Sequence, residues 1–144
     1  MYVSQILKTK GANVVTARAD DTIARVAEQL ATERIGAVVV MGEGRIAGIL
    51  SERDIAYGLA RHGQDLLALR VSDLMSRLVA TCSPEDDTGT LMEMMTDRRV
   101  RHLPVLDNGK LAGIISIGDV VKARLSEMAV EVNELRDYVA GRTA

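Results

Sequence analysis

Two copies of one short motif hold the residues best suited to bind a ligand. The segment Gly48-Ile-Leu-Ser51-Glu-Arg-Asp54 recurs as Gly113-Ile-Ile-Ser116-Ile-Gly-Asp119, each time between an apolar run and a helical pattern. In a functional interpretation the glycine permits close approach, and the N–H groups at the start of the helix face a phosphate. The serine would donate to that phosphate, and the aspartate would accept hydrogen bonds from both hydroxyls of a ribose. The motif therefore predicts a nucleotide site.

A second interpretation needs no ligand. Serine followed three residues later by an acid, at the entry to a helix, is the pattern of a capping box, in which each side chain satisfies a backbone donor of the first turn. Either copy taken alone is explained by capping. The duplication of the motif in register is what favours the ligand.

The duplication extends well beyond the motif. Moving the first half along the chain by 65 residues places Gly44 to Leu59 on the segment that starts at Gly109, without gaps. Matching pairs upstream include Thr16 with Thr81 and Arg34 with Arg99. A repeat of this length, used twice, indicates two copies of one supersecondary unit that bury their faces against each other.

Each copy is predicted to be a strand, a helix, a hairpin of two strands and a second helix, so the fold class is α/β (α+β). Asp21 or Thr22 can cap the first helix, and the hairpin turns are Gly42-Glu43-Gly44 and Asp107-Asn108-Gly109. Gly89 weakens the corresponding helix of the second copy. The other predicted elements are strands at Val14–Thr16 and Leu78–Thr81, a helical connector at Val71–Met75, and helices at Glu52–His62 and Ile117–Val139.

Composition excludes several classes of function. The net charge of −2 provides no general attraction to nucleic acid or anionic lipid. The chain has no Trp or Phe on which single-stranded nucleic acid could stack. Cys82 is the only cysteine, and with His62 and His102 it forms no metal-ligand spacing. No apolar run is long enough for a membrane span, and no signal peptide is recognisable, so we expect a cytoplasmic protein.

The doubled G-h-h-S-x-x-D motif, together with Arg101-His102-Leu103-Pro104-Val105, resembles the cystathionine β-synthase (CBS) domain family from about Val3 to Leu125. The resemblance implies a stand-alone tandem pair, or Bateman module, of two βαββα repeats related by a pseudo-twofold axis. It implies two clefts that bind AMP, ADP, ATP, NAD or S-adenosylmethionine, and a homodimer formed by disc-like pairing of modules through their helices.

The resemblance also implies that each cleft takes residues from both repeats. One cleft would consist of Ser51, Asp54, Thr81, Arg101 and His102. The other would consist of Ser116, Asp119, Thr16, Gly36 and Ala37. Arg101 would supply the phosphate cation of the first cleft, and Arg53 is expected to reach across to the second, where Gly36 has no side chain. His102 has a plain alternative as a surface or packing residue.

The division along the chain follows the repeats. We expect repeat 1 with its lead-in at residues 1–70, repeat 2 at 71–128 and a C-terminal helical extension at 129–144. The extension has an apolar stripe, including Val132 and Leu135, which would cover a partner subunit or fold back on its own module. Met92, Met94 and Met95 are expected to serve packing.

The sequence contains no recognisable catalytic motif, so we expect a regulatory or sensory module and not an enzyme. One cation per cleft fits AMP or NAD better than a triphosphate. The ligand would act by favouring one arrangement of the repeats and so bias an unidentified effector protein. The alternatives are an interaction module that binds ligand weakly or not at all and, less favoured, a nucleotide-processing enzyme.

Overall fold

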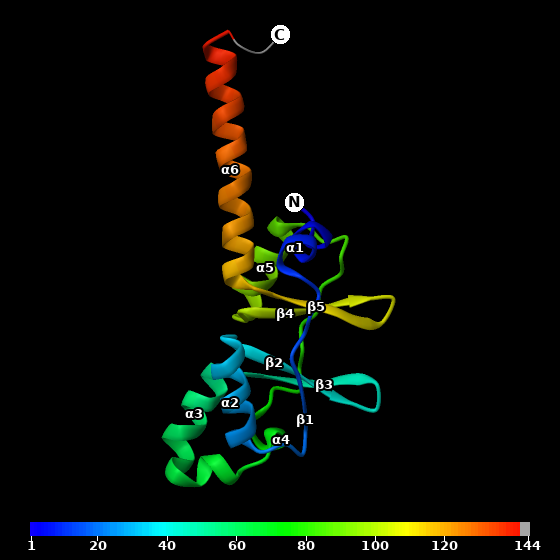
Figure 1. Ribbon diagram of the computed structural model, residues 1–144, viewed down its shortest axis with the longest axis vertical. Helices are drawn as coiled ribbons and strands as arrows, with labels where there is room; N and C mark the ends of the chain where they lie inside the picture. The colour runs from blue at the N-terminus through cyan, green and yellow to red at the C-terminus, as the bar shows by residue number, and fades with distance from the viewer. Residues whose placement is uncertain (142–144) are drawn as a thin grey trace. The chain divides into compact units, whose positions relative to one another are not determined.

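The computed structural model describes residues 1–141, and the chain divides into two compact units (Figure 1). The first-repeat unit consists of Asn13–Ala80 with the short segment Asn108–Ala112. The second-repeat unit consists of Met1–Ala12, Thr81–Asp107 and the chain from Gly113 onward. Each unit therefore includes a segment that is distant in sequence from the rest of its repeat.

A three-stranded sheet forms the centre of the first-repeat unit. Its strands are β1 (Thr16–Arg18), β2 (Ala37–Gly42) and β3 (Arg45–Ser51), in the order β1-β2-β3. β1 pairs with β2 in parallel, and β2 pairs with β3 antiparallel. All four residues at the start of β2 are buried, as expected for a central strand covered on both faces.

Three helices and a 3-10 turn complete this unit: α2 (Ile23–Glu33), α3 (Glu52–His62), η1 (Gly63–Ala68) and α4 (Val71–Leu74). Thr22, and not Asp21, caps α2, because its Oγ1 accepts a hydrogen bond from Arg25 N at 3.3 Å. The helices bury their apolar faces in one core. That core consists of Ala17, Ile23, Val26, Leu30, Val38, Val40, Leu50, Leu66, Val71 and Met75.

The second-repeat unit contains α1 (Val3–Lys10), α5 (Thr88–Arg98) and α6 (Ile117–Val139) beside the hairpin of β4 (His102–Asp107) and β5 (Lys110–Ser116). Gly89 lies in the first turn of α5, where the helix is preserved by the Asp87 cap. The fully buried hydrophobic side chains of this unit are Val3, Leu91, Leu103, Val105, Ile115 and Val120. Met95 is also buried, whereas Met92 is 43% exposed.

Both hairpin turns have the predicted chemistry. Glu43 and Gly44 have φ of 53° and 74°, and Asn108 and Gly109 have φ of 52° and 78°. Two consecutive residues at positive φ form the type I′ turn that matches the twist of a hairpin.

Most predicted elements are confirmed, and two differ. The helices at 52–62 and 117–139 have the expected bounds, while the first strand lies at Thr16–Arg18, two residues later than predicted. The strand predicted at Leu78–Thr81 is wrong. Leu78 is 93% exposed, and only Cys82 pairs in parallel with Val105. Residues 142–144 of the expected extension lie outside the described residues.

Helix α1 was not predicted as an element, and it has a counterpart in α4. Within their units, α1 and the residues directly after α4 each lie against the glycine that opens a Ser-x-x-Asp motif. A Cβ at Gly48 would lie 2.7 Å from Ser76 O and 2.8 Å from Met75 Sδ. A Cβ at Gly113 would lie 2.5 Å from Leu7 Cδ2. These glycines therefore permit a close approach of the chain itself.

No helix in residues 1–141 is long and apolar enough to cross a membrane.

The two glycines offer a matched test of this packing. Gly48→Ala should destabilise the protein by about 3 kcal/mol, because a backbone oxygen bonded to Ile49 N blocks the new methyl group. Gly113→Ala should cost about 1 kcal/mol, because the Leu7 side chain can move. Urea denaturation measures both free energies of unfolding.

Second substitutions serve as the control. Leu7→Ala should remove most of the added cost of Gly113→Ala, whereas Met75→Ala should leave the cost of Gly48→Ala in place. Equal rescue of the two glycine variants would contradict this account.

Candidate functional site

The first Ser-x-x-Asp motif lies at the junction between β3 and α3. Ser51 is the last residue of β3 and the N-cap of α3. Asp54 Oδ2 accepts hydrogen bonds from Ser51 N at 2.9 Å and from Ser51 Oγ at 3.1 Å. Ser51 Oγ accepts from Asp54 N at 3.4 Å. This is a complete capping box.

The second motif repeats that geometry where β5 meets α6. Asp119 Oδ2 accepts from Ser116 N at 2.8 Å and from Ser116 Oγ at 2.9 Å, and Ser116 Oγ accepts from Asp119 N at 3.2 Å. The capping interpretation is thus confirmed in both copies. Each bond to the carboxylate ends on Oδ2, so Oδ1 takes no part in the cap. The caps hold both carboxylates rigidly while leaving an acceptor oxygen for another partner.

One residue outside the predicted site contacts the second motif. Lys10, the last residue of α1, places its Nζ 2.5 Å from Asp119 Oδ2 and 2.7 Å from Ile114 O. No charged group within the described part of the first-repeat unit pairs with Asp54 in this way. Lys10 lies in the lead-in, outside the aligned repeat, and a lysine near a helix end has no distinctive pattern. Its role could not be read from the sequence.

Lys10 also shapes the electrostatics of the site. Burial alone would raise the pKa of the Asp119 carboxyl. Hydrogen bonds from Lys10 and Ser116, with the charge of Lys10, outweigh burial and lower that pKa below its usual value. Lys10 and Asp119 line a cavity of about 260 Å³ between α1 and α6, together with Lys122 and Ser126.

Two other predicted site residues of the first-repeat unit, Gly36 and Ala37, lie close to its motif. Gly36 O accepts a hydrogen bond from Glu52 N at 2.9 Å, and Ala37 pairs with Ser51 across β2 and β3. Thr16 is exposed at the start of β1, and Arg53 is half-buried in the first turn of α3.

The second-repeat unit contains the counterpart of the Gly36 bond. Arg101 O accepts from Ile117 N at 2.8 Å, so the backbone of Arg101 is fixed beside Ser116. The Arg101 residue is exposed, and His102 opens β4 half-buried. Thr81 is half-buried next to the bridging Cys82. Each unit therefore ties the residue before its hairpin to the helix that carries its aspartate.

Cys82 is not a candidate nucleophile. Burial, with the charge of Asp86, raises the pKa of its thiol to about 12, so the reactive thiolate is absent near neutral pH. Among residues 1–141, no three histidine, cysteine or acidic side chains gather where they could hold a metal ion.

Comparison with protein families decides the classification. The model of the CBS domain matches the chain twice, over residues 3–61 and 71–126. The chain belongs to the CBS domain family. The two matches are the two repeats, so the chain contains a tandem CBS pair of mixed α/β fold.

Relatives and solved structures agree with this classification. The chain is 32% identical to the mitochondrial CBS domain-containing protein CBSX3 of Arabidopsis thaliana, over 96% of this chain and 72% of that protein. It resembles the crystal structure of the CBS-domain containing protein ATU1752 of Agrobacterium tumefaciens with a TM-score of 0.84 and 46% identity, over 86% of this chain and 99% of that one.

A third similarity is to another CBS domain pair. The crystal structure of the CBS domain pair of protein MJ0100, in complex with 5′-methylthioadenosine and S-adenosyl-L-methionine, has a TM-score of 0.77 at 23% identity. The similarity covers 88% of this chain and 98% of that one, and it shows that the two share a fold.

The Lys10–Asp119 pair should make stability depend on pH. Because the folded-state pKa of Asp119 is lowered, the ion pair stabilises the protein above the unfolded-state pKa and is lost as the pH falls through the folded-state value. Asp119→Asn should lower the free energy of unfolding by about 0.5–1 kcal/mol near neutral pH, since the pair is partly exposed. The difference from wild type should shrink in acid. Urea denaturation across pH measures it.

Lys10→Met removes the other member of the ion pair. It should lower the free energy of unfolding by a similar amount near neutral pH, and it should cause little further loss when combined with Asp119→Asn. Asp54→Asn is the matched control, since it alters the same kind of cap without an ammonium partner in its unit, and its effect should be independent of Lys10. Additive losses from Lys10→Met and Asp119→Asn would show that the two side chains do not interact.

Proposed function

We propose that this CBS pair is a regulatory module that binds adenosine nucleotides at its two Ser-x-x-Asp motifs. The observation that carries the proposal is the equal geometry of the two capped carboxylates. Corresponding hydrogen bonds in Ser51–Asp54 and Ser116–Asp119 differ by no more than 0.2 Å. In both, a fixed carboxylate oxygen is available to accept from ribose hydroxyls at the start of a helix.

A related fold supports the choice of ligand class. The CBS pair of MJ0100 was crystallised with 5′-methylthioadenosine and S-adenosyl-L-methionine, two ligands that share an adenosine. The adenosine portion is the part that a ribose-binding carboxylate recognises. We therefore assign this chain the adenosine class, with AMP or NAD favoured and ATP, ADP or S-adenosylmethionine as further members.

The family resemblance assigns the remaining ligand contacts. Thr81, Arg101 and His102 would complete the site of Ser51 and Asp54. Thr16, Gly36, Ala37 and Arg53 would complete the site of Ser116 and Asp119. One arginine per site matches a monophosphate or a dinucleotide better than a triphosphate.

Lys10 makes the two sites unequal. A ribose that binds Asp119 must share the carboxylate with the Lys10 ammonium group, which lies 2.5 Å from Oδ2, or displace that group. Asp54 has no such competitor in its unit. We therefore expect a nucleotide to fill the Asp54 site before the Asp119 site. Once displaced, Lys10 remains available as a cation for the phosphate of a second ligand.

The output of the module would be conformational and not catalytic. A nucleotide that binds one arrangement of the repeats more tightly shifts the population toward it, by no more than its difference in affinity. We propose a cytoplasmic homodimer whose ligand state is detected by an effector protein.

A second candidate function rests on α6. Large apolar side chains on this helix are exposed, among them Leu125, Leu135 and Val139 at 61%, 63% and 78%. Such a surface is typical of an interaction module. In that case the motifs would act as caps only, and the role of the chain would be to hold a partner.

Nucleotide titration distinguishes the two functions. Isothermal titration calorimetry with AMP and NAD should show two sites of unequal affinity in the wild-type protein. Asp54→Asn should weaken the tighter site about tenfold or more, because a hydrogen bond to a charged acceptor contributes about 1.5–3 kcal/mol. Asp119→Asn should weaken only the other. Arg101→Ala and Arg53→Ala should each lower the affinity of one site.

Unfolding in urea controls for loss of the cap, since asparagine can still accept from the serine backbone. Absence of binding by any adenosine ligand, in a folded wild-type protein, would favour the interaction module. Conversion of the nucleotide into product would revive the enzyme alternative.

A further inference from the structure

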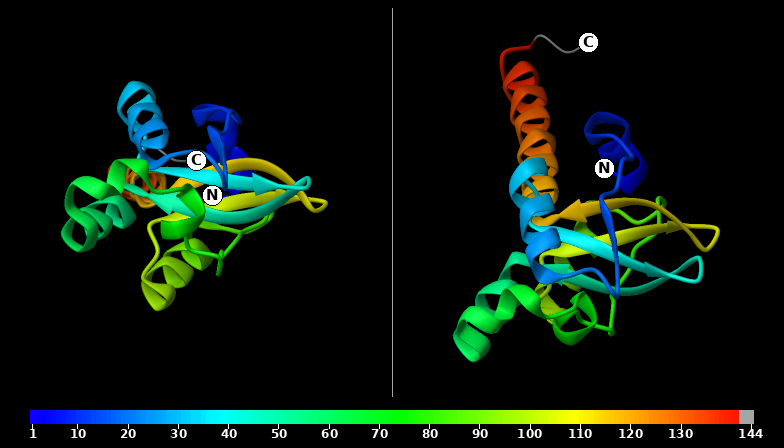
Figure 2. Two further views of the ribbon diagram at one scale, coloured as in Figure 1. Left: turned by 90° about the horizontal axis from the view of Figure 1, so that it is seen from below. Right: turned by 60° about the horizontal axis from the view of Figure 1, so that its bottom comes forward.

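Helix α6 continues beyond the part of the chain that the family accounts for. The family match ends at residue 126, and α6 runs unbroken from Ile117 to Val139. Its C-terminal half projects past α1 and α5 of the same unit in Figure 1, and past α1 in the right-hand view of Figure 2. From residue 128 to 139 only Asp137 is half-buried, and every other residue is exposed. This half of the helix therefore receives little support from its own unit.

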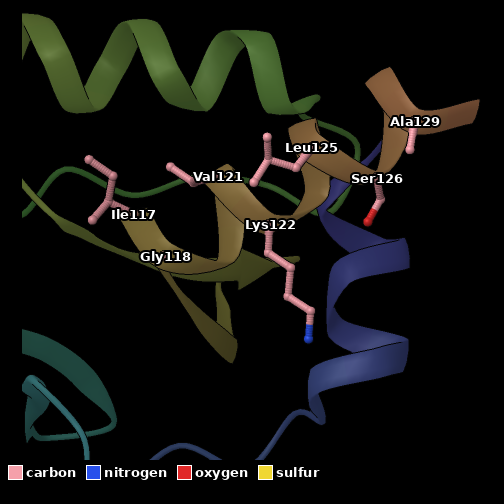
Figure 3. A pocket seen from close by; sticks show the side chains of 7 residues that line it. All are labelled: Ile117, Gly118, Val121, Lys122, Leu125, Ser126 and Ala129. Atoms are coloured by element: carbon pink, nitrogen blue, oxygen red, sulfur yellow. The ribbon is translucent and has the colours of Figure 1, made fainter. Parts of the chain in front are cut away.

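Six of the exposed apolar residues of α6 form one continuous line, which we call the α6 stripe. Its members are Val121, Leu125, Met128, Val132, Leu135 and Val139, all exposed. Their spacing alternates between four and three residues, which is the heptad pattern of a coiled coil. Val121 and Leu125 point to the same side of the helix and line a shallow groove with Ile117 (Figure 3).

The projecting half of α6, residues 128–139, would be marginal as an isolated helix, because helices shorter than about 12–15 residues depend on packing of an apolar face. The stripe extends over about 27 Å at 1.5 Å per residue. We propose that it packs against the α6 stripe of a second copy of this chain, as a parallel, in-register, two-stranded coiled coil. The proposal does not rest on the proposed nucleotide binding.

The residue types in the α6 stripe indicate how many helices would pair in the coiled coil. Leu125, Val132 and Val139 occupy a positions, and Val121, Met128 and Leu135 occupy d positions. A β-branched residue at a with leucine at d favours two strands. Val132, Leu135 and Val139 follow this rule in the C-terminal half of the helix.

Charges beside the stripe select the orientation. Glu131 lies at a g position and Arg136 at the following e position, so a parallel pair places Glu131 beside Arg136 of the second copy on both sides. An antiparallel pair with full overlap would instead place Lys122 beside Arg136, and Glu131 beside Glu131. The parallel pair is attractive where the antiparallel pair is repulsive.

Disulfide trapping tests the register directly. In the parallel arrangement Leu135 lies opposite its own copy, so Leu135→Cys should form a covalent dimer under mild oxidation. Asn133→Cys, on the outer face, is the matched control and should not. The wild-type protein provides the background, since its buried Cys82 has a raised thiol pKa and should not cross-link.

The outcomes separate the alternatives. Cross-linking of Leu135→Cys alone supports the proposal. Cross-linking only when Leu125→Cys and Leu135→Cys are combined would indicate an antiparallel pair and overturn it. A dimer in sedimentation without any cross-link at Leu135 would leave a homodimer in place and reject the coiled coil, and a monomer would reject both. None of these results bears on nucleotide titration.

A charge exchange supplies a second measurement that keeps Leu135. Glu131→Arg and Arg136→Glu should each weaken self-association about threefold to tenfold, since each puts like charges together on both sides of the pair. The double variant restores opposite charges and should recover most of the affinity. Analytical ultracentrifugation at low salt measures the change. Full additivity of the two losses would contradict the parallel pair.

Discussion

The bond between a serine and an aspartate three residues later determines how the rest of each repeat is arranged. Ser51 and Ser116 end a strand and start a helix, and the aspartate closes the cap through both the backbone and the hydroxyl of the serine. The cap fixes the exit angle of the helix and the position of the carboxylate together. A structural device thus also orients the group that would meet a ribose, so capping and ligand binding are compatible interpretations.

The symmetry of the two repeats does not extend to α1 and α4. This difference separates the features that the sequence could predict from those that it could not. Capping motifs, type I′ turns and the helices at 52–62 and 117–139 depend on local chemistry, so they could be predicted. The role of Gly48 and Gly113 depends on segments far away in sequence, which a local pattern cannot reveal.

The same reason accounts for the part of the site that was missed. Lys10 is 109 residues from Asp119 in sequence, and its partner is determined by the packing of α1 on β5 and α6. The strand expected at Leu78–Thr81 failed for a related cause. Its apolar residues suggest a strand, yet Leu78 faces solvent and only Cys82 reaches the neighbouring strand. Tertiary packing decides which residues of a β-favouring run form the pairing.

Helix α6 joins the two proposals physically. Its first turn is the cap that holds Asp119, and its last turns carry the exposed stripe, with no break between Ile117 and Val139. A rigid helix transmits displacement along its axis, so a change at Asp119 that moves the first turn also moves the stripe. Lys10 adds a third component, because it ties α1 to that same carboxylate. A ligand that displaced Lys10 would therefore act on the lead-in helix and on the paired helix at once. Such coupling would let a small molecule alter the relation between two copies of the chain without contacting the surface that joins them.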